Sequence, residues 1–386
     1  MRTVIRNARI VTANEVLDNL EISILDGKIE RIAERIATAD SVIDAEGCWL
    51  VPGFIDLHCH GGDGFEFMDA DVSEIGRIEK FHLSHGTTTL YATTLSSDVT
   101  ELNLALMRLG EYLENNPSGA IEGVHLEGPW LNPEQCGAQN PEYIRSYSVG
   151  DLTALATKFA FIKRVSAAPE IEGGYDIAEE ARSLGIIASV AHTSADFRNI
   201  ECAISHGYTL ITHLYSGMRG VWRENSYRIA GAVEGALHFD ELCVELIADG
   251  CHLPDELLRF VYKIKGSDNI ALVTDAIRAS GLPDGTKTRI GSMKSGLEVM
   301  VEDGVAKLVT GDSFAGSAAT FDRLYRIMAR ATGAGMVELS RMASTTPASV
   351  MGLSDRGRIA VGLRADLIIM DSELKIKRVF LKGEPI

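Results

Sequence analysis

Two histidines that close an apolar segment carry the strongest candidate chemistry in the chain. His58 and His60 follow residues 50–57, with Cys59 between them. Alternate side chains of a β-strand share a face about 6.6 Å apart, so both imidazoles reach one metal ion while Cys59 points the other way. Further candidate ligands directly follow other apolar segments: Glu127, His192, His213 and Asp275. The set predicts a divalent metal site, zinc or iron, with one ion or with two ions that share Glu127.

Asp275 carries a separate prediction. An aspartate after a strand is commonly a helix cap. A metal ion, however, lowers the pKa of a bound water toward about 7, and a neighbouring carboxylate can take the proton and pass it to a leaving group. We therefore predict that Asp275 is the general base and then the general acid in hydrolysis of an amide.

Eight short apolar segments are predicted to be strands, and helical patterns alternate with them. The strands are residues 54–60, 87–94, 121–127, 164–168, 187–192, 209–213, 243–248 and 270–275, with helices such as 175–184, 255–264 and 318–332 between them. Eight parallel strands with intervening helices predict an α/β fold, a (β/α)8 TIM barrel, whose strand ends meet at one mouth. A single histidine is more often an ordinary core or surface residue. The joint placement at five strand ends is what favours a site.

The two ends of the chain have a different texture. Short β-rich segments separated by turns occupy residues 1–51, with Asp26-Gly27 and Glu46-Gly47 as turn signals, and residues 355–386 look the same. Open sheet edges invite aggregation, so we expect the two ends to meet in one small β-sandwich domain beside a barrel of residues 52–354.

Composition narrows the class of protein. The chain has 386 residues and a formal net charge of −17, which argues against a broad nucleic-acid or anionic-membrane surface. No apolar stretch approaches the ~20 residues of a membrane span, and the first residues lack a secretory signal. Six scattered cysteines without a CxxC pair favour reduced thiols over disulfides. We expect a cytoplasmic enzyme without nucleic-acid or membrane partners.

Two motifs are highly specific: His-Leu-Glu-Gly-Pro-Trp at 125–130 and Ile-Ala-Asp-Gly-Cys-His at 247–252. Further likeness runs along essentially the whole chain, at 52–56, 168–170, 191–193, 212–215, 273–276 and 315–317. On these motifs the chain resembles the amidohydrolase superfamily and, within it, the N-acetylglucosamine-6-phosphate deacetylases. A glutamate ligand on strand three, with no lysine at the end of strand four, is similar to this family and unlike relatives that use a carbamylated lysine.

The resemblance implies hydrolysis of the acetamide of N-acetylglucosamine 6-phosphate to glucosamine 6-phosphate and acetate by a cytoplasmic homodimer. It implies that Glu127, His192 and His213 bind the retained metal, while His58 and His60 match members with a second ion. Asp275 matches the catalytic acid and base. His252 and Arg223 match residues that grip the sugar phosphate, one of them across the dimer interface. Arg219 and Arg228 share the loop of Arg223 and remain alternatives for the phosphate.

The sugar pocket departs from the family pattern. The family carries a histidine where this chain has Gln139, and Asn-Ala where it has Ser216 and Gly217. We expect the substrate to contact Ala138, Gln139, Ser216, Gly217, Arg223 and His252. The departures leave N-acetylgalactosamine 6-phosphate or another N-acyl amino sugar open, because pocket contacts resolve such epimers. Hydrolysis of an N-acyl amino acid or cyclic amide is a further alternative. A non-catalytic sugar-phosphate-binding homologue is disfavoured by the complete ligand set and acid/base.

Overall fold

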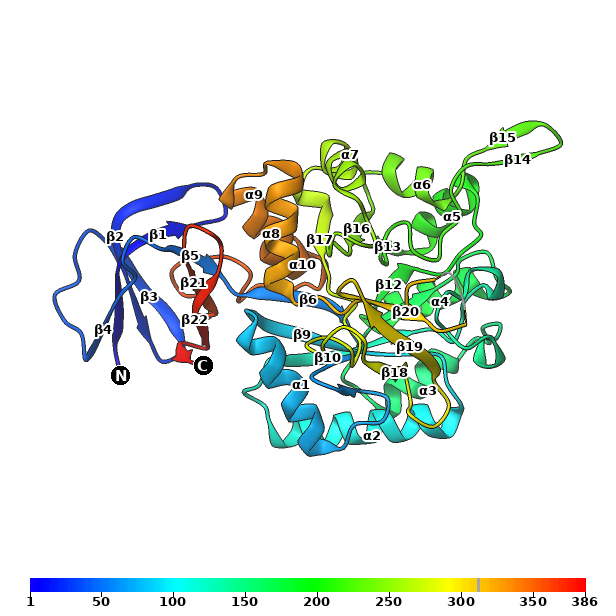
Figure 1. Ribbon diagram of the computed structural model, residues 1–386, viewed down its shortest axis with the longest axis horizontal. Helices are drawn as coiled ribbons and strands as arrows, with labels where there is room; N and C mark the ends of the chain where they lie inside the picture. The colour runs from blue at the N-terminus through cyan, green and yellow to red at the C-terminus, as the bar shows by residue number, and fades with distance from the viewer. Residues whose placement is uncertain (311–312) are drawn as a thin grey trace.

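The computed structural model describes residues 1–310 and 313–386. Figure 1 shows two bodies side by side: a sheet at the left that contains both chain ends, and a larger α/β body at the right. The larger body carries the predicted site residues and is built on a parallel barrel.

The barrel strands follow one another in the order β6-β9-β10-β11-β12-β13-β16-β17, and every neighbouring pair is parallel. Their bounds are β6 Phe54–Cys59, β9 Thr87–Thr94, β10 Ile121–Glu127, β11 Ile162–Ala167, β12 Ile187–Val190, β13 Tyr208–Ile211, β16 Cys243–Leu246 and β17 Ile270–Leu272. The predicted TIM barrel is therefore confirmed. The largest difference is in the eighth strand, which ends at Leu272 rather than Asp275, because the chain turns to place Asp275.

The barrel closes just beyond the end of β17. The Asp275 N–H donates to the His58 carbonyl at 2.8 Å, and the His60 N–H donates to the Ala276 carbonyl at 2.7 Å. These backbone hydrogen bonds tie the first strand to the eighth at the level of the predicted ligands.

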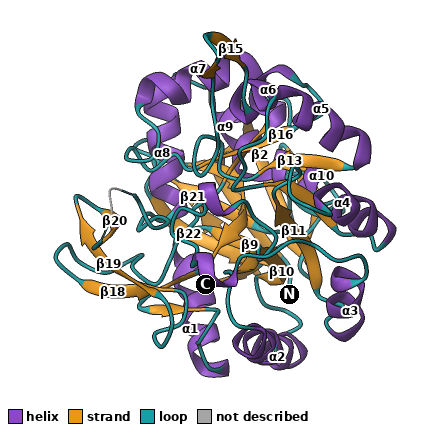
Figure 2. Ribbon diagram, turned by 90° about the vertical axis from the view of Figure 1, so that its right-hand side faces the viewer, coloured by secondary structure: helices purple, strands orange, loops and turns teal. Residues whose placement is uncertain are grey.

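One helix follows each barrel strand, and Figure 2 shows these helices ringing the central strands. Their bounds are α1 Val72–Ser84, α2 Val99–Asn115, α3 Asp151–Lys158, α4 Gly174–Ser183, α5 Phe197–His206, α6 Ala232–His238, α7 Asp255–Lys265 and α8 Phe321–Thr332. Asp71 and Asp196 begin α1 and α5 with capping boxes that satisfy the free N–H groups of the first turn. Three short helices follow: α9 Met336–Ser340, the π-helix η4 Arg341–Thr345 and α10 Thr346–Val350. Within the described ranges, no helix has the length and apolarity to cross a bilayer.

The terminal sheet joins the two ends of the chain. Its strands are β1 Thr3–Val11, β2 Val16–Leu25, β3 Lys28–Ala33, β4 Ser41–Asp44, β5 Trp49–Pro52, β21 Leu367–Met370, β22 Ile376–Leu381 and β23 Glu384–Pro385. β21 pairs antiparallel with β5, and β1 pairs with β4 near its start and with β5 near its end. Because β1 changes partner along its length, the sheet folds over its own apolar core. The exact limits of this domain stay a prediction.

The apolar segment at 50–57 is not one strand. It divides at Gly53 into β5 of the terminal sheet and β6 of the barrel. A Cβ at Gly53 would lie 2.1 Å from the Thr88 Oγ1, so only glycine permits this approach to β9. Apolarity is continuous because both strands are buried, and Gly53 is where they divide.

Three small sheets lie outside the predicted elements. The hairpin β14 Trp222–Glu224 and β15 Tyr227–Ile229 projects from the barrel at the upper right of Figure 1. A three-stranded sheet, β18 Lys287–Ile290, β19 Leu297–Glu302 and β20 Val305–Leu308, follows the eighth barrel strand. A short pair, β7 Gly61–Gly62 and β8 Phe65–Glu66, follows the first.

Candidate active site

The predicted metal ligands converge around Glu127 at the mouth of the barrel. Its Oε1 lies 2.9 Å from the His213 Nε2 and 3.2 Å from the His192 Nε2. Its Oε2 lies 3.4 Å from the His60 Nε2. The Asp275 Oδ1 lies 3.1 Å from the His60 Nε2 and 3.3 Å from the His58 Nε2. Two groups with metal-ligand spacing result: His58, Glu127 and His213, and His58, His60 and Asp275.

This donor set fits a divalent ion. The Nε2 atoms of His58 and His60 face each other at 3.1 Å, and both are turned toward the same two carboxylates. All these side chains are buried. Buried carboxylates need a partner of opposite charge, and imidazole nitrogen with carboxylate oxygen is the donor mixture that zinc and iron accept.

The electrostatics keep the carboxylates ionised. Burial by itself would lower the pKa of His58, but Glu127 and Asp275 raise it to about 10. Burial opposes ionisation of Asp275, yet the charges of His58 and His60 hold its pKa at about 2. The Asp275 carboxyl is therefore ionised at neutral pH, which is the form in which a general base acts.

Three of these residues have left-handed backbone. His192 has φ of 43°, His213 has φ of 28° and Asp275 has φ of 47°. L-residues avoid this region, and such conformations concentrate at functional sites where the surrounding structure enforces them. Each of the three stands just past the end of its strand, so this turn redirects the side chain into the barrel mouth.

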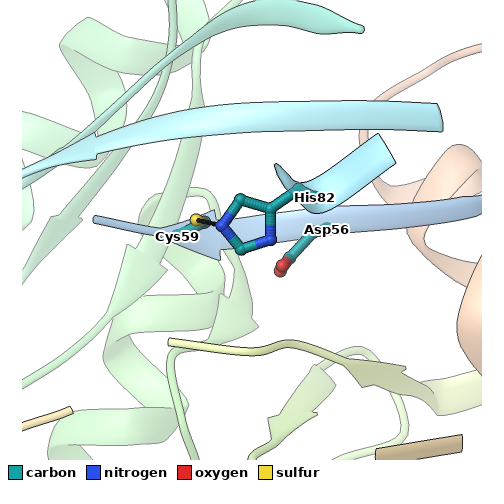
Figure 3. A group of neighbouring side chains, drawn as sticks. All are labelled: Asp56, Cys59 and His82. Atoms are coloured by element: carbon teal, nitrogen blue, oxygen red, sulfur yellow. Dashed lines mark hydrogen bonds between the residues drawn. The ribbon is translucent and has the colours of Figure 1, made fainter. Parts of the chain in front are cut away.

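Cys59 points away from the cavity, as strand alternation requires. Its Sγ lies 3.2 Å from the Nε2 of His82 on α1, and Asp56 lies beside them on β6 (Figure 3). The three side chains have metal-ligand spacing and are buried. The Asp56 carboxylate, however, already accepts hydrogen bonds from the Thr274 hydroxyl at 2.6 Å and from the Thr274 N–H at 3.1 Å. This cluster lies between strand and helix, outside the cavity, and packs the barrel wall.

A cavity of about 240 Å³ opens at the metal-ligand cluster. Predicted substrate-binding residues in its wall are Ala138, Gln139, Ser216, Gly217 and His252. Further wall residues that the sequence did not single out include Leu95, Ile290, Ser313 and Phe314. Ile290 belongs to β18, so the three-stranded sheet contributes to the cavity.

His252 is oriented by a carboxylate that sequence reasoning did not assign a role. The His252 Nδ1 lies 2.8 Å from the Asp249 Oδ2, and the Asp249 Oδ1 accepts the His252 N–H at 2.9 Å. The Phe314 ring lies against the imidazole, with centroids 4.9 Å apart. Among the described residues none forms a hydrogen bond with the His252 Nε2, and His252 lies in the cavity wall. The Asp-Gly-Cys-His order at 249–252 contained the signal, because an aspartate three residues before a histidine suits such a turn.

Arg223 does not line this cavity. It lies on β14 opposite Arg228 of β15, and both are exposed on the projecting hairpin. Arg219 stacks on Trp222, with its guanidinium carbon 4.1 Å from the ring centroid. Within the described part of one chain, none of the three arginines is in the cavity wall.

An ion pair inside the barrel supports the cluster from below. Arg164 of β11 forms a salt bridge with Glu245 of β16, and both side chains are fully buried. The Glu245 Oε2 lies 3.5 Å from the His58 Nδ1 and accepts the His213 N–H at 3.2 Å. Sequence reasoning missed both residues. Their signal was a charge within an apolar strand, which alternation alone assigns to solvent.

Comparison with known proteins agrees with this fold and site. Residues 49–386 match the family model described as the amidohydrolase family. The chain therefore belongs to the amidohydrolase family and is a hydrolase.

The relatives place it more narrowly, in the N-acetylglucosamine-6-phosphate deacetylase branch of that family. It is 32% identical to the N-acetylglucosamine-6-phosphate deacetylase of Bacillus subtilis (strain 168), over 98% of this chain and 96% of that protein. It is 30% identical to the N-acetylgalactosamine-6-phosphate deacetylase of Escherichia coli O157:H7, over 100% of this chain and 99% of that protein. The structure of the Mycobacterium smegmatis N-acetyl-D-glucosamine-6-phosphate deacetylase in complex with N-acetyl-D-glucosamine-6-phosphate superimposes with a TM-score of 0.91 at 30% identity, covering 100% of this chain and 99% of that one.

Proposed function

We propose that the chain hydrolyses the acetamide of N-acetylglucosamine 6-phosphate, releasing acetate and glucosamine 6-phosphate. The observation that carries the proposal is the convergence of His60, Glu127, His192, His213 and Asp275 on one cavity, with the buried His58 beside Asp275. Relatives of this length and identity named for amino-sugar phosphate deacetylation support the substrate class. The six unpaired cysteines suit action in the reducing cytoplasm.

Residues of the chain would bind the metal and transfer the protons of this reaction. Glu127, His192 and His213 would hold one divalent ion, zinc or iron, and His58 and His60 would hold a second beside Asp275. A bound ion would supply Lewis-acid chemistry, polarising the acetamide carbonyl and acidifying a water molecule. The Asp275 Oδ1 takes a proton from the attacking water. The same carboxyl then gives the proton to the nitrogen of the leaving amine, so the C–N bond breaks to a neutral amine.

The sugar is positioned by residues of the cavity wall. Asp249 holds the His252 ring through Nδ1, and the other ring nitrogen, Nε2, would then bind a polar group of the sugar phosphate. Ala138, Ser216 and Gly217 border the same space. A Cβ at Gly217 would come within 2.6 Å of the His192 Nδ1, so this part of the wall lies directly on a ligand ring.

Arg223 needs a second subunit to meet the phosphate. The hairpin that carries it projects away from its own barrel (Figure 1), and Tyr227 and Val221 beside it are exposed apolar residues. We propose a homodimer in which this hairpin reaches the cavity of the partner. A guanidinium fork then binds the phosphate oxygens bidentately.

Release of acetate tests the proposal. Enzyme of assayed metal content is given N-acetylglucosamine 6-phosphate, N-acetylgalactosamine 6-phosphate and unphosphorylated N-acetylglucosamine. We expect the first to have the highest kcat/KM. Preference for the second selects the galactosamine alternative, which the E. coli relative favours. No turnover of any of the three by metal-loaded enzyme overturns deacetylation of these sugars and points to a different acylated substrate.

A further inference from the structure

Gln139 contacts a predicted metal ligand. Its side chain is 3% exposed, and its Nε2 donates to the Glu127 Oε2 at 2.7 Å. That distance belongs to a strong, charge-assisted hydrogen bond. The residue was expected to contact the sugar, but its amide nitrogen is committed to the carboxylate at the centre of the cluster.

The orientation of the amide is fixed by its other end. The Gln139 Oε1 accepts the N–H of Ser96 at 2.8 Å, directly after β9. A flipped amide would set its N–H against the Ser96 N–H and its oxygen against the Glu127 carboxylate. Both contacts would be repulsive, so Nε2 faces Glu127.

This hydrogen bond acts on a carboxylate with two separate tasks. The Glu127 Oε1 faces His192 and His213, whereas Oε2 faces His60. Rotation about the Cγ–Cδ bond of Glu127 would exchange these oxygens or turn both away from their partners. A donor held at Oε2 by the loop after the neighbouring strand prevents that rotation.

We propose that Gln139 is a positioning residue of the metal centre, which locks the Glu127 carboxylate with one oxygen toward His192 and His213 and the other toward His60. The proposal rests on the proposed metal site and goes beyond it, because it moves Gln139 from the sugar to the metal. Outer partners of this kind are worth about 10- to 100-fold in metal affinity.

Two variants remove the donor in different ways. Gln139→Glu keeps the shape and an acceptor for Ser96 but faces Glu127 with an oxygen, and Gln139→Met removes both hydrogen bonds at similar volume. The control is Ser216→Ala, in the wall of the same cavity. Among the described residues, the Ser216 hydroxyl has no hydrogen bond to a predicted ligand.

Metal-stripped proteins are titrated with Zn²⁺ in competition with a chromophoric chelator, and the rise of Tm on metal addition is recorded. We expect both Gln139 variants to bind Zn²⁺ about 10- to 100-fold more weakly than the wild type and to show a smaller rise of Tm. At saturating Zn²⁺ their KM for N-acetylglucosamine 6-phosphate should be unchanged. Ser216→Ala should show wild-type Zn²⁺ affinity.

Unchanged Zn²⁺ affinity of the Gln139 variants overturns the proposal, and a raised KM in the same variants would return Gln139 to the sugar. A wild-type protein that binds no Zn²⁺ or Fe²⁺ would instead overturn the proposed metal site itself. The metal-free Tm of each variant shows whether the fold is intact, so the failures are distinguishable.

Discussion

At the level of single residues, a variant of Asp275 distinguishes proton transfer from metal binding. Asp275→Asn keeps size and a left-handed backbone that asparagine tolerates, but it removes the base. We expect kcat to fall by about 10²- to 10⁴-fold, with metal content near the wild type because Glu127, His192 and His213 remain. Steady-state kinetics and metal analysis measure the two effects. Asp71→Asn, the same change at a helix cap, is the control. Full activity of Asp275→Asn would remove Asp275 from the mechanism.

The buried pair Arg164 and Glu245 predicts a non-additive effect on stability. Arg164→Met leaves the Glu245 charge buried without its partner, so we expect the free energy of unfolding to drop by about 3–5 kcal/mol. The double variant Arg164→Met, Glu245→Gln removes that charge as well and should recover much of the loss. Denaturant unfolding of the metal-free proteins measures both. A double variant no more stable than Arg164→Met would mean that the two side chains do not interact.

The convergence of the predicted ligands could be foreseen from the sequence, and the residues that support them could not. Each of these residues lies at or just past the carboxyl end of a barrel strand, so the barrel rule brings them together without knowledge of any contact: His58, His60, Glu127, His192 and His213. Arg164 and Glu245 are partners that lie far apart along the chain. Asp249 reaches His252 only through a local turn. Pairing of this kind depends on barrel register, which a single sequence does not specify.

At the level of elements, the contact between β6 and α1 has its own pH dependence. Burial lowers the pKa of His82 to about 4, against an ordinary value near 6.5. Below pH 6.5 the unfolded chain binds a proton that the folded protein rejects, so His82 makes stability fall as pH drops from 6.5 to 4.

We expect His82→Gln, which keeps a donor for the Gly61 carbonyl, to flatten this dependence by about 1 kcal/mol per pH unit. The measurement is the free energy of unfolding against pH for wild type and variant. Burial raises the pKa of Asp56 to about 7, with the opposite effect in the same range, so only the difference between the two proteins is informative. Parallel curves would contradict the assignment.

Elements were predicted where periodicity and length are strong. The barrel strands and the terminal strands β1 and β4 fall where alternation and turns place them. The β18–β20 sheet and the β14–β15 hairpin were missed, because strands of three to six residues in polar loops carry little periodic signal. The missed elements border the cavity or carry Arg223, and function-bearing loops are where local patterns are weakest.

At the level of the whole molecule, Arg223 tests the assembly. Arg223→Ala should raise KM for phosphorylated substrate far more than for N-acetylglucosamine, since only the phosphate meets the guanidinium. Steady-state kinetics on both substrates make the comparison. Equal losses would transfer the role to Arg219 or Arg228.

Mixing two impaired variants, at a concentration of phosphorylated substrate well below the KM of Arg223→Ala, shows whether that arginine crosses between subunits. In a mixed dimer of Arg223→Ala and Asp275→Asn, one cavity has an intact Asp275 and receives Arg223 from the other chain. Random exchange should restore about a quarter of wild-type activity. A mixture as inactive as its components would mean that each cavity uses its own hairpin.

The left-handed backbone at His192, His213 and Asp275 means that thermal stability and catalytic activity favour different residues at these positions. Glycine adopts this conformation without the penalty of about 1–3 kcal/mol that other residues incur. In the metal-free protein we expect Asp275→Gly to melt at a higher temperature than Asp275→Ala, by calorimetry; equal melting would show a relaxed backbone. Directed evolution for heat resistance alone would therefore tend to replace these three residues by glycine. A screen for more stable variants must select for turnover at every round.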